Sequence, residues 1–502
     1  MPLTVLSDSD LRTLLLQLTK QDILDLQQNL ADALHHYSTS TEEDDNNGCC
    51  ESFQSAGTSL KSKDGGLMTV TPASSNDGLG VKITTRLEAS SSDTASVTSS
   101  MDSLALSQNS TPSSKSSATT ASKSNSISAF QTSPSNASLT LFDRSGNPRA
   151  LLNSSEMTAF RTALASTMLF KKRANVHDVV VFGAGKQAYW HIRLALLLRG
   201  DDIHHLNIIN RDFERVHQLL EKLYNPHEAP SNFNPDPSHV PTYRQTAGED
   251  AKEGQKDQHQ YLPRPKIQIL TPGHGEYPRL LHATLRSSSC IFLCTQSPTP
   301  LFPAAILTNP EGRRKGRYIA AVGSLSPHST ELHPDILKQN VAPDHGHRHF
   351  HKHAQQGGAI VVDSVDRCLK EAGEVVQAGL GPDQVVEIGE LVMLKRDADR
   401  RRRECMAGKG MEAEGLDVGD VELGECEMNK TEKKKKARKG SGEEKEKHHE
   451  DEDKAHKSLI EWLVKGNVIY KSVGLGLTDV VVGGDLVRIA DERNIGTRIE
   501  NF

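Results

Sequence analysis

The chain has 502 residues, which leaves room for roughly two to three domains. Its hydrophobic fraction is 35% and its aromatic fraction 4%, low values that indicate a globular core diluted by disordered inserts. The net charge of −6 argues against a dedicated nucleic-acid binder. No run approaches the roughly 20 apolar residues of a membrane span, and the seven cysteines lack a metal or disulfide spacing, which suits a cytoplasmic location.

Residues 3–37 are predicted to be helical, because Ile23, Leu26, Leu30 and Leu34 repeat at helical spacing. Strands are expected at 67–70 and 79–85. Two apolar runs around the turn at 146–148 predict a hairpin over 139–152. The later predicted elements are helices over 155–172 and 364–379, a strand–loop–helix–strand–helix run over 178–223, and strands at 267–270, 289–295, 318–322 and 361–363.

Four polar tracts are predicted to be inserts that do not join the core. They are Ser/Thr-rich (88–137), Pro-rich (225–263), His-rich (341–357) and of mixed charge (396–456). The alternating histidines imply no fixed ligand geometry, so no metal site is predicted. The basic run Lys433–Lys439 lies between acidic runs and is interpreted as a solvated linker rather than a nucleic-acid patch.

A glycine-rich loop follows the apolar run Asp178–Phe182, which has the composition of a buried parallel strand. The loop reads Gly183-Ala184-Gly185-Lys186-Gln187-Ala188. The first glycine permits a tight turn, the second lets a pyrophosphate approach the backbone, and the alanine allows close packing of the next helix. That helix, predicted from Gln187 to Arg199, points its N-terminus at the phosphates. The sequence therefore predicts a Rossmann-type dinucleotide site.

The residues after the second strand, Leu206–Ile209, favour NADP(H) as the cofactor. An NAD site normally places an acid there to hold the ribose 2′-hydroxyl. This chain has Asn210 and Arg211, with Arg215 one turn later. Arginine can pair with a 2′-phosphate that an acid would repel. Asp212 lies close by, so NAD(H) stays open as an alternative.

Motifs on both sides of this segment resemble those of the ornithine cyclodeaminase/mu-crystallin family. They are Thr158–Ala163, Ala321–Pro327 with Glu331-Leu332, Val362-Asp363-Ser364 with Glu371–Glu374, Ile388-Gly389-Glu390, and Tyr470–Gly474 with Thr478-Asp479. Each motif is modest alone, and their order and spacing carry the resemblance.

The resemblance implies an α/β fold with a Rossmann-type nucleotide-binding domain (166–345) inserted in a discontinuous α+β substrate and dimerisation domain (1–165 and 358–502). It implies a homodimer that binds a small imino or amino acid. It also implies hydride transfer at a carbon–nitrogen bond. Family cyclodeaminases convert ornithine to proline and ammonia, whereas mu-crystallin-like members reduce cyclic ketimines with NADPH.

The resemblance also assigns residues to the site. Lys82 and Arg161 match the lysine beside the substrate and the arginine that grips its carboxylate, and they are the catalytic candidates. Thr162, next to Arg161, is expected at the substrate. The cofactor candidates beyond the glycine-rich loop and the second strand are Thr295 and Gln296 near the nicotinamide, Val322 and Gly323, and Val473 and Gly474.

Two positions depart from the family's pattern. Gly57 stands where the family carries another carboxylate-binding arginine, and Leu325 stands where true cyclodeaminases place an aspartate that helps activate water. Leucine cannot take a proton, whereas hydride transfer needs only a positioned cofactor and substrate. The sequence therefore favours an NADP(H)-dependent oxidoreductase that reduces the C=N bond of a small cyclic imino acid, like a ketimine reductase. Ornithine cyclodeamination and NADPH binding without turnover stay open as alternatives.

Overall fold

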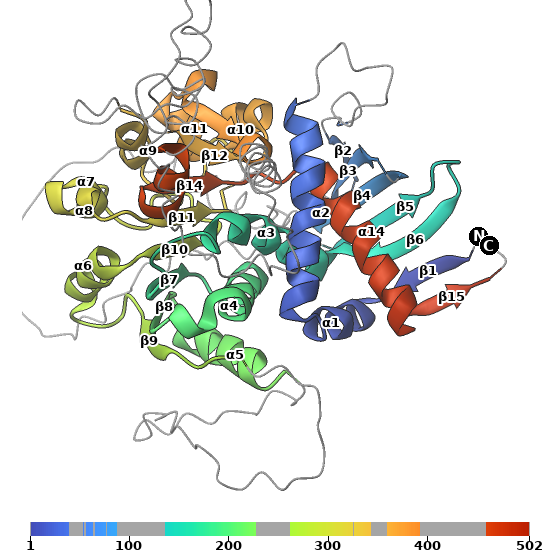
Figure 1. The fold of residues 1–502 in the computed structure, drawn as a ribbon, viewed down its shortest axis with the longest axis horizontal. Helices are drawn as coiled ribbons and strands as arrows, with labels where there is room; N and C mark the ends of the chain where they lie inside the picture. Colours follow the sequence, from blue (N-terminus) through green and yellow to red (C-terminus); the bar gives the residue numbers. More distant parts are fainter. Residues whose placement is uncertain are drawn as a thin grey trace, which may run out of the picture.

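The chain folds around two β-sheets that are connected by a long, almost fully buried helix, α3 (Ser154–Phe170) (Figure 1). The computed structural model describes residues 2–39, 54, 57–63, 66–76, 78–87, 136–226, 262–324, 326–342, 359–391 and 458–500. One sheet is parallel and Rossmann-like, and the other is mixed and built from distant segments. The expected α/β class, with a Rossmann-like parallel sheet and a separate mixed sheet built from discontinuous segments, is confirmed.

The first sheet has seven strands in the order β15-β1-β6-β5-β4-β3-β2. They are β1 (Leu3–Leu6), β2 (Thr58–Lys61), β3 (Gly66–Ser75), β4 (Gly78–Leu87), β5 (Asn136–Phe142), β6 (Pro148–Asn153) and β15 (Thr497–Ile499). Strand β1 pairs in parallel with β6, and all other neighbours are antiparallel. The predicted hairpin over 139–152 is therefore confirmed as β5 and β6.

Three helices accompany this sheet: α1 (Asp8–Leu16), α2 (Lys20–Thr39) and α14 (Gly476–Arg493), with α14 lying beside α2 (Figure 1). The prediction of helix from residue 3 is wrong at its start. Residues 3–6 form β1 because they pair with both β6 and β15. The helix begins only after Ser7, whose hydroxyl accepts the N–H of Asp10 in a capping box.

The second sheet has eight parallel strands in the order β13-β12-β14-β11-β10-β7-β8-β9. They are β7 (Asp178–Phe182), β8 (His205–Ile209), β9 (Lys266–Leu270), β10 (Cys290–Leu293), β11 (Tyr318–Ala321), β12 (Ile360–Val362), β13 (Val385–Glu387) and β14 (Val468–Lys471). The predicted division assigns all of 358–502 to the substrate domain, but β12, β13 and β14 belong to this sheet. Among the described residues after 358, α14 and β15 lie with the first sheet, and Gly389 packs against Leu34 of α2. The predicted division missed this because a short apolar run does not reveal which sheet it joins.

Helices cover both faces of the parallel sheet. They are α4 (Lys186–Arg199), α5 (Phe213–Tyr224), α6 (Tyr277–Ser287), α7 (Ala305–Thr308), α8 (Pro310–Arg314), α9 (Pro334–Val341), α10 (Val365–Glu371) and α11 (Gly373–Ala378), with 3-10 turns at Gly200–Asp202 and Pro382–Gln384. The predicted single helix over 364–379 is two helices, because Ala372 is extended. A Cβ at Gly373 would lie 1.9 Å from the carbonyl oxygen of Ser329, so this break lets the chain pass close to another loop.

The apolar core continues from one sheet to the other. One cluster joins Leu139 and Leu152 of the first sheet, through α3 and α4, to Phe292 and Tyr470 on one face of the parallel sheet. A second cluster fills the opposite face beneath α6, α9 and α11. The two sheets are therefore packed into one body, which fixes where side chains from each can meet.

In the part of the chain that the structure describes, no helix combines the length and the apolar composition that crossing a bilayer requires. The four predicted inserts lie wholly or largely outside the described residues, and Leu325 also lies outside them.

Candidate active site

The glycine-rich loop between β7 and α4 has the geometry of a phosphate cradle. Gly183 has a φ of +106°, and a Cβ there would lie 2.9 Å from the carbonyl oxygen of Cys294. At Gly185 a Cβ would meet no heavy atom within 4 Å, so open space lies in front of this residue. Gly185 caps α4 without a side-chain acceptor, and the first turn of α4 has no acid, which leaves N–H groups for an anion. The loop therefore fits a dinucleotide pyrophosphate.

Asn210, Arg211 and Arg215 lie together at the carboxyl end of β8. The carboxylate of Asp212 accepts the N–H of Glu214 at 2.9 Å and so caps α5, while Asn210 donates to the Asp212 carbonyl at 2.7 Å. Arg211 and Arg215 are exposed, and neither forms an ion pair with a described residue. The nearby acid is therefore engaged by a helix end, and two guanidinium groups are left to meet an anion.

Lys186, the first residue of α4, connects the phosphate loop to the first sheet's unit. Its Nζ lies 2.9 Å from Ser155 Oγ and 3.0 Å from Glu156 Oε2, both at the start of α3. The Glu156 carboxylate is buried and also accepts Trp190 Nε1–H at 2.9 Å. The helix that carries Arg161 is thereby fixed against the helix that would bind the phosphates.

A buried ionic cluster forms where β4, α3 and α14 meet. Lys82 Nζ lies 3.0 Å and 3.1 Å from the two carboxylate oxygens of Asp479 and 2.7 Å from Thr158 Oγ1. Arg161 Nε lies 3.1 Å from Asp479 Oδ1. The predicted pair, Lys82 and Arg161, is thus brought together by an aspartate that the sequence assignment did not include, although Thr478-Asp479 is one of the family-like motifs.

The charges of this cluster act on one another. Burial lowers the pKa of the Lys82 ammonium group, and Asp479 partly offsets that effect. Burial alone would raise the pKa of Asp479, but Arg161 and Lys82 hold it below its ordinary value. With all three groups ionised, the cluster carries one net positive charge, which suits a ligand with a carboxylate.

Thr162 does not join the cluster through any hydrogen bond in the described residues. Its hydroxyl donates to the carbonyl of Thr158 at 2.8 Å, within α3 itself. Gly57 lies close to the cluster instead. A Cβ at Gly57 would lie 2.9 Å from Thr71 Oγ1, and Thr71 is the register partner of Lys82. Gly57, Thr71 and Lys82 therefore follow one another across the same face of the sheet.

The loop after β14 touches the cluster from the parallel sheet. Gly474 has a φ of +87°, and a Cβ there would lie 2.9 Å from Arg161 Nη2. Asp363, after β12, holds this loop by accepting the N–H groups of Gly474 at 2.7 Å and Val473 at 3.2 Å. Arg161 is therefore packed against the carboxyl edge of the parallel sheet, where ligands of open α/β sheets bind.

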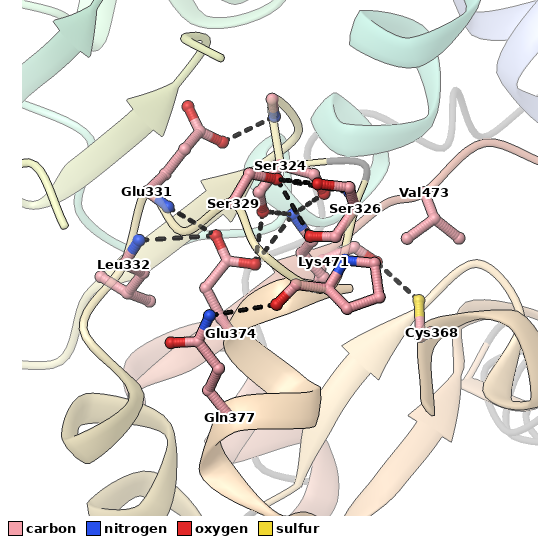
Figure 2. A network of polar contacts seen from close by, with 12 residues as sticks. Ser324, Ser326, Ser329, Glu331, Leu332, Cys368, Glu374, Gln377, Lys471 and Val473 are labelled. Carbon is pink, nitrogen blue, oxygen red and sulfur yellow. Dashed lines mark hydrogen bonds and ion pairs between the residues drawn. The ribbon is translucent and has the colours of Figure 1, made fainter. Parts of the chain in front are cut away.

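Two further predicted cofactor loops, after β10 and β11, lie side by side at the same edge. The N–H of Thr295 and the N–H of Gly323 both donate to the buried Glu331. Val322 is buried and donates to the Leu293 carbonyl, whereas Gln296 is exposed. Beneath these loops lies a network that includes Ser324, Glu374 and Lys471, drawn in Figure 2.

Sequence reasoning did not find Glu331, Asp363 or Asp479 as site residues, because each acts through partners that are distant in the chain. Their only sequence signal is their place in the family-like motifs. Among the described residues, no three histidine, cysteine or acidic side chains are placed to hold a metal ion.

Sequence comparison identifies one relative. The chain is 26% identical over 256 residues to YGL159W, an uncharacterized protein of Saccharomyces cerevisiae. The match spans 48% of this chain and 58% of that protein, so less than two thirds of the relative is covered. No family sequence profile matches the chain.

Solved structures share the fold over almost the whole chain. The Δ1-pyrroline-2-carboxylate reductase of Thermococcus litoralis, in complex with NADH and L-proline, matches with a TM-score of 0.53 at 14% identity, over 99% of this chain and 100% of that one. An archaeal alanine dehydrogenase dimer with bound NAD has a TM-score of 0.53 at 14% identity, over 100% of both chains. A probable ornithine cyclodeaminase from Bordetella pertussis has a TM-score of 0.51 at 16% identity, over 99% of both chains.

At these identities the likeness establishes the fold. The resemblance to the ornithine cyclodeaminase/mu-crystallin family is confirmed at that level.

Proposed function

We propose that this chain, which has the fold of NAD(P)-dependent oxidoreductases of the ornithine cyclodeaminase/mu-crystallin family, reduces the C=N bond of a small cyclic imino acid with NADPH. The observation that carries the proposal is the contact of Arg161 with Gly474. It brings the Lys82–Asp479–Arg161 cluster to the edge of the parallel sheet, beside the loops that would surround a nicotinamide. A carboxylate held there would lie next to a hydride donor.

Arg161 would bind the substrate, and Lys82 would transfer the proton. Arg161 keeps Nη1 free of partners among the described residues, so it can bind the substrate carboxylate while Nε stays on Asp479. The cofactor, when bound, supplies a hydride to the imine carbon. Lys82 supplies the proton that a neutral imine nitrogen needs, and burial lowers the pKa of Lys82, which makes its ammonium group a stronger acid.

The same contacts disfavour activation of water, which cyclodeamination needs. Asp479 is held as a carboxylate between two cations, and its pKa is lowered by them against the effect of burial. Asp363 accepts hydrogen bonds from the N–H groups of Val473 and Gly474 and from the Ser472 hydroxyl. Neither Asp479 nor Asp363 is therefore placed as a general base.

The cofactor preference that we propose is NADP(H) over NAD(H). Arg211 and Arg215 are exposed at the carboxyl end of β8, and Asp212 is occupied as the N-cap of α5. A 2′-phosphate would meet two cations there, whereas a ribose hydroxyl would find no free carboxylate among these residues.

We also propose that the chain forms a homodimer through the outer face of the seven-stranded sheet. Exposed apolar side chains from five strands lie on that face: Leu60, Met68, Leu79, Leu151 and Ile499. A solvated sheet face is normally polar, so this face is suited to burial against a second copy. A similar fold is found as a dimer in the archaeal alanine dehydrogenase.

The free thiols of Cys290, Cys294 and Cys368 are compatible with the cytoplasmic location that we predict.

The test is NADPH oxidation by the purified full chain with a panel of five- and six-membered cyclic imines that carry a carboxylate. We expect turnover, and we expect Lys82→Met to lower kcat/KM by about 100- to 10,000-fold with NADPH affinity unchanged. Lys370→Met, which removes an exposed lysine of α10, is the matched control. Tight NADPH binding without turnover of any imine would overturn the proposal in favour of a binding protein. Formation of proline and ammonia from ornithine would favour a cyclodeaminase.

A further inference from the structure

Glu331 lies in the segment between β11 and α9, and its two carboxylate oxygens bind the start of the loop after β10 and the start of its own segment, respectively. Oε1 accepts the N–H of Thr295 at 2.6 Å and its hydroxyl at 3.0 Å. Oε2 accepts the N–H of Gly323 at 2.6 Å. The side chain is fully buried, so no water replaces these contacts.

Glu331 is itself held from below by the network in Figure 2. Its backbone N–H donates to Glu374 Oε1 at 2.8 Å, and Glu374 Oε2 lies 3.2 Å from Lys471 Nζ. Lys471 also donates to the carbonyl of Ser324 at 2.8 Å. Glu374 comes from α11 and Lys471 from β14, so the segment that contains Ser324 and Glu331 is fixed relative to two other elements.

The two loops have almost no room to shift toward each other. A Cβ at Gly323 would lie 1.7 Å from the carbonyl oxygen of Thr295, so the two backbones are in direct contact. Because one carboxylate binds both loops through different oxygens, it sets their separation as well as their tilt. An amide could not do the same, because its NH₂ group would face an N–H donor.

We propose that Glu331 is a positioning residue for the nicotinamide end of the bound cofactor. It acts by joining the loops at Thr295 and Gly323, which follow β10 and β11 at the same edge of the sheet as Gly474, the residue packed against Arg161. The proposal rests on the proposed function for the identity of the cofactor. It assigns to Glu331 the alignment of the nicotinamide with the substrate, and not contact with either.

The charges around Glu331 make a test by substitution feasible. Lys471 and Glu374 form their own ion pair at 3.2 Å, so removing the charge of Glu331 leaves no unpaired cation in the network. On the β10 side, burial and, after it, the charge of Glu331 raise the pKa of the Cys294 thiol, so that side holds no cation among the described residues that Glu331 would leave unpaired. The variant Glu331→Gln is therefore expected to fold.

The experiment compares three readouts in Glu331→Gln: kcat with the cyclic imine, the dissociation constant of NADPH, and that of adenosine 2′,5′-bisphosphate, which lacks the nicotinamide. We expect kcat to fall by about 10- to 100-fold, since misplacement by an ångström is that costly. NADPH should bind several-fold more weakly, and the bisphosphate should bind as it does to the unchanged chain.

The matched control is Glu387→Gln, at the end of β13. That carboxylate also accepts a backbone N–H, from Val365 at 2.8 Å, but it lies on the edge strand of the sheet. It should leave all three readouts unchanged. Normal kcat and normal NADPH binding in Glu331→Gln would overturn the proposal, and so would an equal loss of NADPH and bisphosphate binding.

Thr295→Val keeps the test decisive if the glutamine variant does not fold. This change removes only the hydroxyl contact with Glu331. It should weaken NADPH binding by a smaller factor than Glu331→Gln does and leave bisphosphate binding unchanged. No change in NADPH binding would overturn the proposal. If the unchanged chain reduces no imine, the proposed function fails. The comparison of NADPH with the bisphosphate still tests Glu331 by itself.

Discussion

Replacing Asp479 with asparagine would remove the carboxylate that lies between Lys82 and Arg161. Its oxygens are 3.0 Å and 3.1 Å from Lys82 Nζ, and one is 3.1 Å from Arg161 Nε. The three side chains are exposed by only 12%, 8% and 4% for Lys82, Arg161 and Asp479, so water screens little of their interaction. The variant would hold two buried cations next to a neutral amide.

We expect this change to lower the free energy of unfolding by about 3–5 kcal/mol, the usual cost of breaking a buried ion pair from one side. At roughly 2–4 °C per kcal/mol, the melting temperature should fall by about 6–20 °C. In the variant, burial and Arg161 both lower the pKa of Lys82, and Asp479 no longer opposes them. A lowered lysine pKa means that the unfolded chain binds more protons, so the variant regains stability as pH rises.

The assay is thermal and urea unfolding of both proteins between pH 6 and pH 9. The double variant Lys82→Met/Asp479→Asn should lose less than the sum of the two single changes, because only one cation is then left unpaired. A melting temperature of Asp479→Asn within about 2 °C of the unchanged chain at neutral pH, which corresponds to less than about 1 kcal/mol, would refute the reasoning.

Four other outcomes follow from described contacts. Arg211→Ser should lower the affinity for NADPH by about tenfold or more in calorimetric titrations, because a charge-assisted contact is worth about 1.5–3 kcal/mol. The affinity for NADH should not change, and equal effects on both cofactors would contradict the prediction. Gly474→Ala should raise the KM of the imine by a larger factor than the dissociation constant of NADPH, because the new methyl group would press on Arg161 Nη2; a larger loss of NADPH binding would contradict it. Leu151→Glu, on the outer face of the first sheet, should convert a dimer to monomers in sedimentation experiments, whereas a monomeric unchanged chain would remove the dimer proposal. Burial raises the pKa of Glu331 to about 7, so its contribution to stability is complete below pH 4.5 and is lost as pH rises to about 7; unfolding of Glu331→Gln should lack that pH dependence.

The parts of the fold that could be predicted are those whose signal is local. The loop Gly183–Ala188 lies between an apolar strand and a helix, and each glycine has its own backbone requirement, so the pattern predicts its surroundings. The hairpin of β5 and β6 is likewise set by its own turn. Arg161 and Lys82 could be assigned only through a resemblance to known proteins.

What could not be predicted depends on partners that are far away in the chain. Residues 3–6 are a strand because β6 and β15 pair with them, and no local pattern contains those strands. Asp479 pairs with a lysine 397 positions earlier. A buried carboxylate such as Glu331 looks in the sequence like any surface glutamate, because its donors, Thr295 and Gly323, lie 36 and 8 positions earlier in the chain.

The position of β14 has a consequence for how the protein is made. This strand lies between β11 and β12, but it is synthesised after both of them and after β13. Until residues 468–471 leave the ribosome, β11 and β12 each present an unpaired edge that could pair with another chain. The parallel sheet is therefore completed late in synthesis, and a chain that stops before β14 would expose the inner edges of β11 and β12 and would tend to aggregate.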